Sequence, residues 1–276
     1  MRTRAIRDLA QLSDQDFFSE VSSGIDHGLR NAVQIERDAQ LLGEHERARG
    51  YHILSAVVKE EAAKILILLD AVRCPRNQAD HFSRQLGRFH NHLAKGIYAE
   101  VCDWRPATFG ELISYVDRER KAFFLDGPND VDWIFRNEIL QGREEMIYVD
   151  YVCTDDGHQW WAPYDDFLVV HTPGVLRLVQ TFSNLGCTTP EALSVIANLW
   201  RPVDMTAEYP WADLRDLNAQ TLEELASRGL LRGQRGDSYR VIVDDWSFPL
   251  FSVDLGLVKV NQDDLREIQQ RWVPDW

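Results

Sequence analysis

Cysteine is scarce in this sequence and shows no paired spacing. The chain has four cysteines, none of which forms a CxxC pair, and they are Cys74, Cys102, Cys153 and Cys187. A disulfide framework or a thiolate zinc site needs paired or clustered cysteines. We therefore predict neither, and we expect these four side chains to be small buried hydrophobes.

Long apolar runs are also missing. The longest uninterrupted apolar stretch is Ile65–Leu69, whereas a membrane-spanning helix needs roughly 20 such residues. The beginning of the chain is too polar for a secretory signal. These absences predict a cytoplasmic protein.

The motifs of several common enzyme classes are absent as well. The sequence has no glycine-rich phosphate loop, no serine nucleophile elbow and no HExxH zinc motif. The segments that begin at Asp126 and Thr154 are typical of turns and not of calcium loops. We predict no bound cofactor and no metal.

The excess of acidic residues is unevenly distributed along the chain. The formal net charge is −14, yet residues 1–120 contain 17 Lys and Arg against 18 Asp and Glu. The remaining 156 residues therefore contain 13 against 26. This balance argues against a surface that coats nucleic acid broadly, but it leaves room for a local basic site in the N-terminal half.

What the sequence does contain is a series of helical patterns. With 276 residues and 45% hydrophobic content, it can bury one large core or two smaller ones. Apolar spacing predicts helices over residues 25–42, 53–72 and 82–101, and Thr108 with Glu111 forms a capping box for another. The predicted fold class is mostly α, with an up-and-down helical bundle.

The helix predicted over residues 53–72 is apolar almost all round but carries Glu60, Glu61 and Lys64 in its middle. Charged groups are rarely placed in a core unless they are paired or used. Glu61 shares a stripe with apolar residues and should face inward. Glu36 lies on the apolar stripe of the preceding helix, so we expect a second inward carboxylate.

The helix predicted over residues 82–101 has an apolar stripe on one side and basic residues on the other. The side chains expected on the polar half are Arg84, Arg88, His92 and Lys95. His90 falls on the apolar side. Two interpretations stay open: these groups bind phosphate, or they form a solvated basic face with His90 as a hydrogen-bonded core histidine.

The period of the hydrophobic pattern changes after this helical part. Residues 130–145 fit one more helix, and residues 146–152 and 158–163 fit two strands around a turn, which predicts a β-hairpin. Trp160 and Trp161 are expected to pack this hairpin and the C-terminal core, because no basic residues are interleaved with them for base stacking.

Beyond residue 165 the pattern is mixed. Thr189 and Thr221 are expected to cap helices, and residues 238–246 are predicted to form a strand. A helix followed by a strand occurs in winged helices, but Asp244 and Asp245 weaken a DNA-binding interpretation.

Four segments within about residues 25–165 carry motifs that are specific in combination. The segments are LRNAVQIERDAQLL, HILSAVVKEEAAKILILL, RFHNHLAKGIY and REEMIYVDYVCTDDGHQWWAP. They contain an EExxK helix at Glu60, Glu61 and Lys64, an HxxK motif at His92 and Lys95, and a hairpin with Tyr148, Val149 and Asp150. In this order the motifs resemble the AbiV family of abortive-infection proteins, a branch of the helical HEPN superfamily.

This resemblance implies an organisation and a role. Residues 1–128 would form a HEPN-like helical bundle, residues 129–165 a helix and the YVD hairpin packed on it, and residues 166–276 an acidic mixed α/β region. The implied role is antiviral defence by abortive infection, as a toxin that acts on RNA or translation. The implied partners are RNA, a phage or host protein, and a second copy of the chain, since symmetric dimers are common.

Many HEPN proteins are ribonucleases that need no metal and pair an Arg with a nearby His. Cleavage of RNA by its own 2′-hydroxyl needs a proton shuttle and a cation that holds the phosphate. Arg84 with His90, and Arg47 with His52, have the family's spacing. The candidate catalytic residues are Arg84, Arg88, His90, His92 and Lys95, and the candidate supporting network is Glu36, Glu60, Glu61 and Lys64.

Three other interpretations stay open. The embedded charges can be a purely structural network in which Lys64 neutralises a carboxylate. The chain can be a non-catalytic dimer that binds a phage or host partner. Glu36, Glu61 and a histidine could also hold a metal, although the repeated Glu-x-x-His motif of bundle metal sites is missing.

Overall fold

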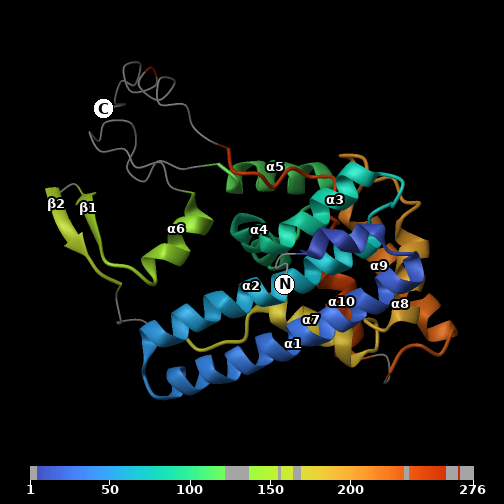
Figure 1. The fold of residues 1–276 in the computed structure, drawn as a ribbon, viewed down its shortest axis with the longest axis horizontal. Helices are drawn as coiled ribbons and strands as arrows, with labels where there is room; N and C mark the ends of the chain where they lie inside the picture. The colour runs from blue at the N-terminus through green and yellow to red at the C-terminus, as the bar shows by residue number, and fades with distance from the viewer. Residues whose placement is uncertain are drawn as a thin grey trace.

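The computed structural model describes residues 5–121, 137–154, 157–163, 169–232 and 236–258, together with Glu267. The fold is mostly helical with one small antiparallel sheet (Figure 1). The elements are η1 (Ala5–Gln11), α1 (Asp14–Glu44), α2 (Ala48–Arg73), α3 (Ala79–Gly87), η2 (Arg88–His90), α4 (His92–Cys102), α5 (Phe109–Glu119), α6 (Glu138–Glu145), β1 (Asp150–Thr154), β2 (Gly157–Trp161), α7 (Gly174–Asn184), α8 (Pro190–Trp200), α9 (Trp211–Ser227) and α10 (Asp237–Asp245).

The helices α1 and α2 form a long antiparallel pair (Figure 1). Ser13 caps α1 by accepting a hydrogen bond from the Asp16 amide. Residues 65–74, at the end of α2, are all buried, because α1, α3, α4, α7 and α8 pack around them. The prediction of a helix that is apolar all round is confirmed for this half of α2.

The chain breaks at Asn91, where the sequence predicted one continuous helix. Asn91 has an extended backbone, and its side chain accepts a hydrogen bond from the Ala94 amide at 3.1 Å to start α4. The local preference of Asn for a cap therefore prevails over the apolar periodicity. As a result, Arg84 and Arg88 do not share a helix face with His92.

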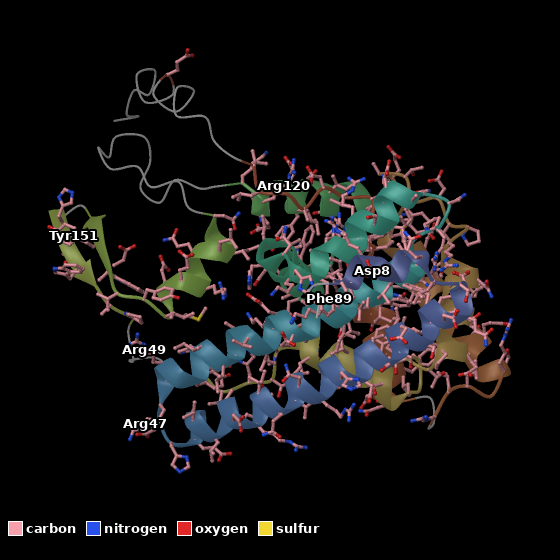
Figure 2. All side chains as sticks on the ribbon, viewed as in Figure 1. Asp8, Arg47, Arg49, Phe89, Arg120 and Tyr151 are labelled. Carbon is pink, nitrogen blue, oxygen red and sulfur yellow. The ribbon has the colours of Figure 1, made fainter. Side chains whose placement is uncertain are left out.

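The predicted hairpin is confirmed. β1 pairs antiparallel with β2, with Tyr151 opposite Trp160 and Asp150 opposite Trp161. The hairpin lies beside α6, at the end of the molecule away from α8 (Figures 1 and 2). Trp160 packs against the hairpin, where its ring lies 5.2 Å from that of Tyr151. The expectation that it also packs the C-terminal core is wrong, because this side chain is 75% exposed.

The C-terminal helices pack on the same core as α1 and α2. One cluster of buried side chains contains residues from α2, α4, α7, α8 and α9. Thr189 caps α8 as predicted. Two expectations are wrong: residues 238–246 form most of helix α10 and not a strand, and Thr221 lies inside α9, where it accepts a hydrogen bond from the Trp200 indole at 3.0 Å.

The described cysteines are free. Cys74 and Cys187 are buried as expected, and Cys102 is half-buried. Burial raises the pKa of the Cys74 and Cys187 thiols to about 12. Cys153 lies in β1, but its side chain is outside the described part of the structure. The turn at Asp126 and the first part of the helix expected over residues 130–145 lie outside the residues described above. Within those ranges, no helix has both the length and the apolar character needed to cross a membrane.

Candidate functional site

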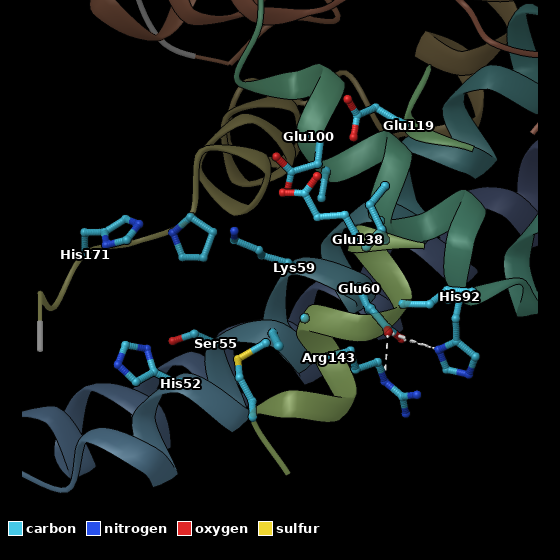
Figure 3. A pocket seen from close by; sticks show the side chains of 18 of the residues that line it. His52, Ser55, Lys59, Glu60, His92, Glu100, Glu119, Glu138, Arg143 and His171 are labelled. Atoms are coloured by element: carbon cyan, nitrogen blue, oxygen red, sulfur yellow. Dashed lines mark hydrogen bonds and ion pairs between the residues drawn. The ribbon is translucent and has the colours of Figure 1, made fainter. Parts of the chain in front are cut away.

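A cavity of about 810 Å³ opens between α2, α4, α5 and α6 (Figure 3). Its wall combines apolar side chains with an unusual number of charged and histidine side chains. The polar lining residues are His52, Ser55, Lys59, Glu60, His92, Glu100, Arg118, Glu119, Glu138, Arg143 and His171. A volume of this size is within the usual range for a small-molecule or substrate site.

Glu60 is the centre of a charge cluster on this wall. Its carboxylate lies 2.9 Å from His92 Nδ1, 2.5 Å from Lys95 Nζ and 3.3 Å from Arg143 Nε. Figure 3 shows Glu60 between His92 on α4 and Arg143 on α6. The cluster therefore joins three helices that are far apart in the sequence.

The members of this cluster differ in their exposure. The Lys95 side chain is 5% exposed and that of Glu60 18%, whereas that of His92 is 45% exposed. Burial alone would raise the pKa of Glu60, but hydrogen bonds and charge from Lys95 and His92 outweigh it and hold the pKa below its ordinary value. Glu60 is thus a fixed anion behind an accessible imidazole.

The contact with Glu60 favours one use of the imidazole. When Nδ1 of His92 carries its proton, it donates to Glu60, and Nε2 becomes the basic nitrogen. A carboxylate that orients a histidine in this way is the arrangement of a general base or acid. Lys95 lies 3.2 Å from the same Nδ1 and supports the carboxylate from the buried side.

The other predicted carboxylates lie apart from this cluster. Glu61 is half-buried, forms an ion pair with Lys64 and accepts a hydrogen bond from Asn31 of α1 at 3.0 Å. Glu36 is buried as expected and accepts a hydrogen bond from Gln40, one turn away, at 3.0 Å. Within the described ranges, no group of three His, Cys, Asp or Glu residues could hold a metal. The metal site suggested for Glu36 and Glu61 is therefore not formed.

Only part of the predicted basic group reaches the cavity. His92 lines the cavity and Lys95 lies behind it, but Arg84 and His90 are exposed and are not among the lining residues. Arg88 is 4% exposed and donates to the carbonyls of Leu250 and Val253. Arg88 therefore has a structural role, because its hydrogen-bonding capacity serves the C-terminal segment. Of the alternative pair, His52 lines the cavity, whereas Arg47 is exposed at the start of α2 (Figure 2).

A second polar cluster, which the sequence did not reveal, lies deep in the core. Asp70 forms an ion pair with Arg73 and accepts hydrogen bonds from Tyr98 at 2.6 Å and from the Leu250 amide at 2.7 Å. The Arg73 guanidinium lies over the adjacent rings of Trp200 and Trp246, with its carbon 4.5 and 4.4 Å from their centroids. The spacing of Asp70 and Arg73, three residues apart near the end of α2, was the available signal.

Four further cavity residues were missed. Arg143 belongs to the segment that resembles AbiV but to none of its motifs, and Lys59 precedes the EExxK motif directly. Glu100 and Glu138 lie on α4 and α6 in no recognisable pattern. A single sequence gives no signal for such residues, because their proximity arises only from helix packing.

Comparison of the chain with models of protein families, with curated proteins and with solved structures finds no match.

Proposed function

We propose that this chain is an antiviral effector that acts by abortive infection and cleaves RNA in the cavity beside His92. The observation that supports this most is the meeting of two motifs that lie 32 residues apart. Glu60 of the EExxK motif contacts both His92 and Lys95 of the HxxK motif. Two of the motifs behind the AbiV resemblance thus meet in space through Glu60, next to a cavity with room for a nucleotide.

In the proposed reaction His92 moves the proton. Nε2 takes the proton of the RNA 2′-hydroxyl, and the resulting oxygen attacks the adjacent phosphorus. The bond to the 5′-oxygen breaks, and the imidazolium returns the proton to that leaving oxygen. The products are a 2′,3′-cyclic phosphate and a 5′-hydroxyl. Glu60 favours the imidazolium that forms during this step, because it lies 2.9 Å from Nδ1.

Arg143 is the proposed phosphate ligand. Its side chain is 43% exposed and contacts Glu60 through Nε, which leaves the terminal guanidinium nitrogens for a phosphate. It takes the place that the sequence suggested for Arg84 or Arg88.

The test is an RNA cleavage assay with purified protein in EDTA. The wild type should produce fragments with 2′,3′-cyclic phosphate ends. His92→Ala should lower the rate about 10²- to 10⁴-fold, the usual contribution of a general base. His90→Ala is the matched control, because His90 is only two residues away, exposed and outside the cavity; it should cleave at close to the wild-type rate.

The outcomes against the proposal are equally definite. Undiminished cleavage by His92→Ala would contradict the role of His92, and equal losses in both variants would indicate a structural effect. Cleavage that requires an added metal would replace the proposed chemistry. An RNA that stays intact under all conditions would overturn the enzyme proposal.

The alternative function is a non-catalytic dimer that binds a phage or host protein. It is favoured by the apolar side chains on and before the hairpin, where Tyr148, Val149, Tyr151 and Trp160 are 62%, 55%, 52% and 75% exposed. Large exposed apolar groups in one place are typical of interaction surfaces. Intact RNA, combined with loss of growth arrest on expression of Trp160→Ser but not of His92→Ala, would support this alternative.

A further inference from the structure

The end of the cavity formed by α4, α5 and α6 carries charged groups that the proposed cleavage chemistry does not use. Glu100, Glu119 and Glu138 come from these three helices, and Lys59 reaches the same region from α2 (Figure 3). Glu119 pairs with Arg118. Among the described residues, Lys59, Glu100 and Glu138 form no hydrogen bond or ion pair. This end therefore has free acceptors beside a free donor.

Glu100 is exposed to solvent, and its carboxyl group lies near other carboxylates. Partial burial raises its pKa, Lys59 acts in the opposite direction, and the nearby charges of Asp103, Glu119 and Glu138 raise it further. A carboxylate without a hydrogen-bond partner gains when a ligand supplies N–H donors. Perturbed groups of this kind in a cavity are typical of binding sites.

We infer that this end of the cavity binds the guanine base of the RNA, with Glu100 accepting from the base edge and Lys59 donating to it. The edge of guanine presents two adjacent donors, N1–H and the N2 amino group, next to the acceptor O6. A carboxylate accepts both donors at once, and an ammonium beside it reaches O6. Adenine, cytosine and uracil lack two adjacent donors on this edge.

The other charges decide between guanine and a small cation. A guanidinium or polyamine ligand would also offer donors to Glu100 and Glu138. However, such a cation has no acceptor for the Lys59 ammonium, which lines the same cavity, whereas guanine presents O6 to it. The inference rests on the proposed function in one respect: a base bound here directs its phosphate towards His92 and Arg143.

Calorimetric titration of the full chain with nucleoside monophosphates tests this inference without requiring cleavage. The wild type should bind GMP roughly 10- to 100-fold more tightly than AMP, CMP or UMP, since bidentate base contacts discriminate by about this factor. Inosine monophosphate, which lacks the N2 amino group, should lie between them. Arginine and spermidine serve as the cationic probes.

Two variants locate the effect. Glu100→Gln should lose the preference for GMP, and Lys59→Ala should weaken GMP binding, whereas Glu20→Gln, on the exposed side of α1, should match the wild type. Thermal unfolding checks that each variant is folded. His92→Ala should keep the preference for GMP, because His92 does not contact the base in this arrangement.

The outcomes separate this inference from the proposed function. GMP preference without RNA cleavage would support the base site and overturn the ribonuclease. Cleavage without GMP preference would overturn the base site alone. Tighter binding of spermidine or arginine than of GMP, or an unchanged preference in Glu100→Gln, would also overturn it.

Discussion

The helix α2 carries two charge clusters ten residues apart, and they are built in opposite ways. Asp70 is 1% exposed and receives hydrogen bonds from Arg73, Tyr98 and the Leu250 amide. Glu60 is near the surface, and its partners His92 and Arg143 are 45% and 43% exposed. One cluster is closed by its partners, whereas the other leaves its partners accessible to a ligand.

The partners explain the difference. The deep cluster also bonds to backbone groups: Arg73 donates to the Ser247 carbonyl, and Asp70 accepts from the Leu250 amide. The nearby Arg88 donates to the Leu250 carbonyl. These bonds attach residues 247–253 to the bundle. The Glu60 cluster instead joins side chains from α2, α4 and α6 at the edge of a cavity. We conclude that the first cluster stabilises the fold and that the second is available for chemistry.

The largest effect should come from breaking the closed cluster with Asp70→Asn. This change leaves the Arg73 guanidinium, 3% exposed, without its counter-ion. Removing one partner of a buried pair usually costs about 3–5 kcal/mol. Urea denaturation should show a loss of this size, while cleavage by the remaining folded protein should be unchanged.

A matched exposed residue provides the control for this change. Asp38→Asn on α1, where the carboxylate is exposed, should alter the unfolding free energy by less than about 0.5 kcal/mol. A loss below about 1 kcal/mol in Asp70→Asn would contradict the comparison, because the two tryptophan rings and the Ser247 carbonyl would then suffice for Arg73.

An intermediate effect is expected where α6 packs on α4. A Cβ added at Gly96 would clash with Ile139 of α6. Gly96→Ala must therefore push α6 away from α4, and Arg143, which lies on α6, would move away from Glu60. Such overpacking costs about 1–3 kcal/mol. Urea denaturation should show this loss, and the cleavage assay should show a lower rate.

Two further variants test the cause. Gly142→Ala, on α6 and facing open space, should be neutral or stabilising by roughly 0.5–1 kcal/mol because it removes a helical glycine. Adding Ile139→Ala to Gly96→Ala should restore both stability and activity. If the double variant is no better than Gly96→Ala alone, contact with Ile139 is not the reason for the loss.

The smallest effect on stability should appear in Glu60→Gln, and it should depend on pH. The pKa of Glu60 in the folded state is below its ordinary value of 4.5. Its charge therefore stabilises the protein above about pH 4.5, and this contribution is lost as the pH falls through the lowered folded-state pKa. Glu60→Gln should be less stable than the wild type at pH 7, and the difference should shrink in acid.

Glu20→Gln, an exposed substitution on α1, is the control for the pH profile, and it should follow the wild type at every pH. At pH 7, Glu60→Gln should also slow RNA cleavage, because an amide does not stabilise the imidazolium of His92. A difference in stability that stays constant from pH 7 to pH 3 would contradict the assignment of Glu60 as the titrating group.

The sequence predicted local features well where one residue type has one strong preference. Thr108 and Thr189 cap the helices that follow them, as predicted. Thr221 was misassigned as a cap, because Thr also occurs inside helices when its hydroxyl has a hydrogen-bond partner. Here the Trp200 indole supplies that partner, which only packing could bring.

For the site, the sequence indicated the right helices but only half of the residues. The charges in the middle of the apolar helix pointed to Glu60 and Glu61, and the downstream motif pointed to His92 and Lys95. Arg88 was misjudged because the break at Asn91 turns α3 away from α4. Its charge then serves the carbonyls of Leu250 and Val253.

The amino-acid order alone determined most of the helices and caps, the hairpin and the presence of charges in an apolar helix, since these depend on neighbours within a few positions. The exceptions are α10, the break at Asn91 and Thr221. Tertiary structure alone decided which charges are closed off and which stay accessible. Asp70 and Glu60 are alike in type and helix, and they differ in what packs against them from far along the chain. Burial and pairing are properties of that packing, so they could be read only from the folded protein.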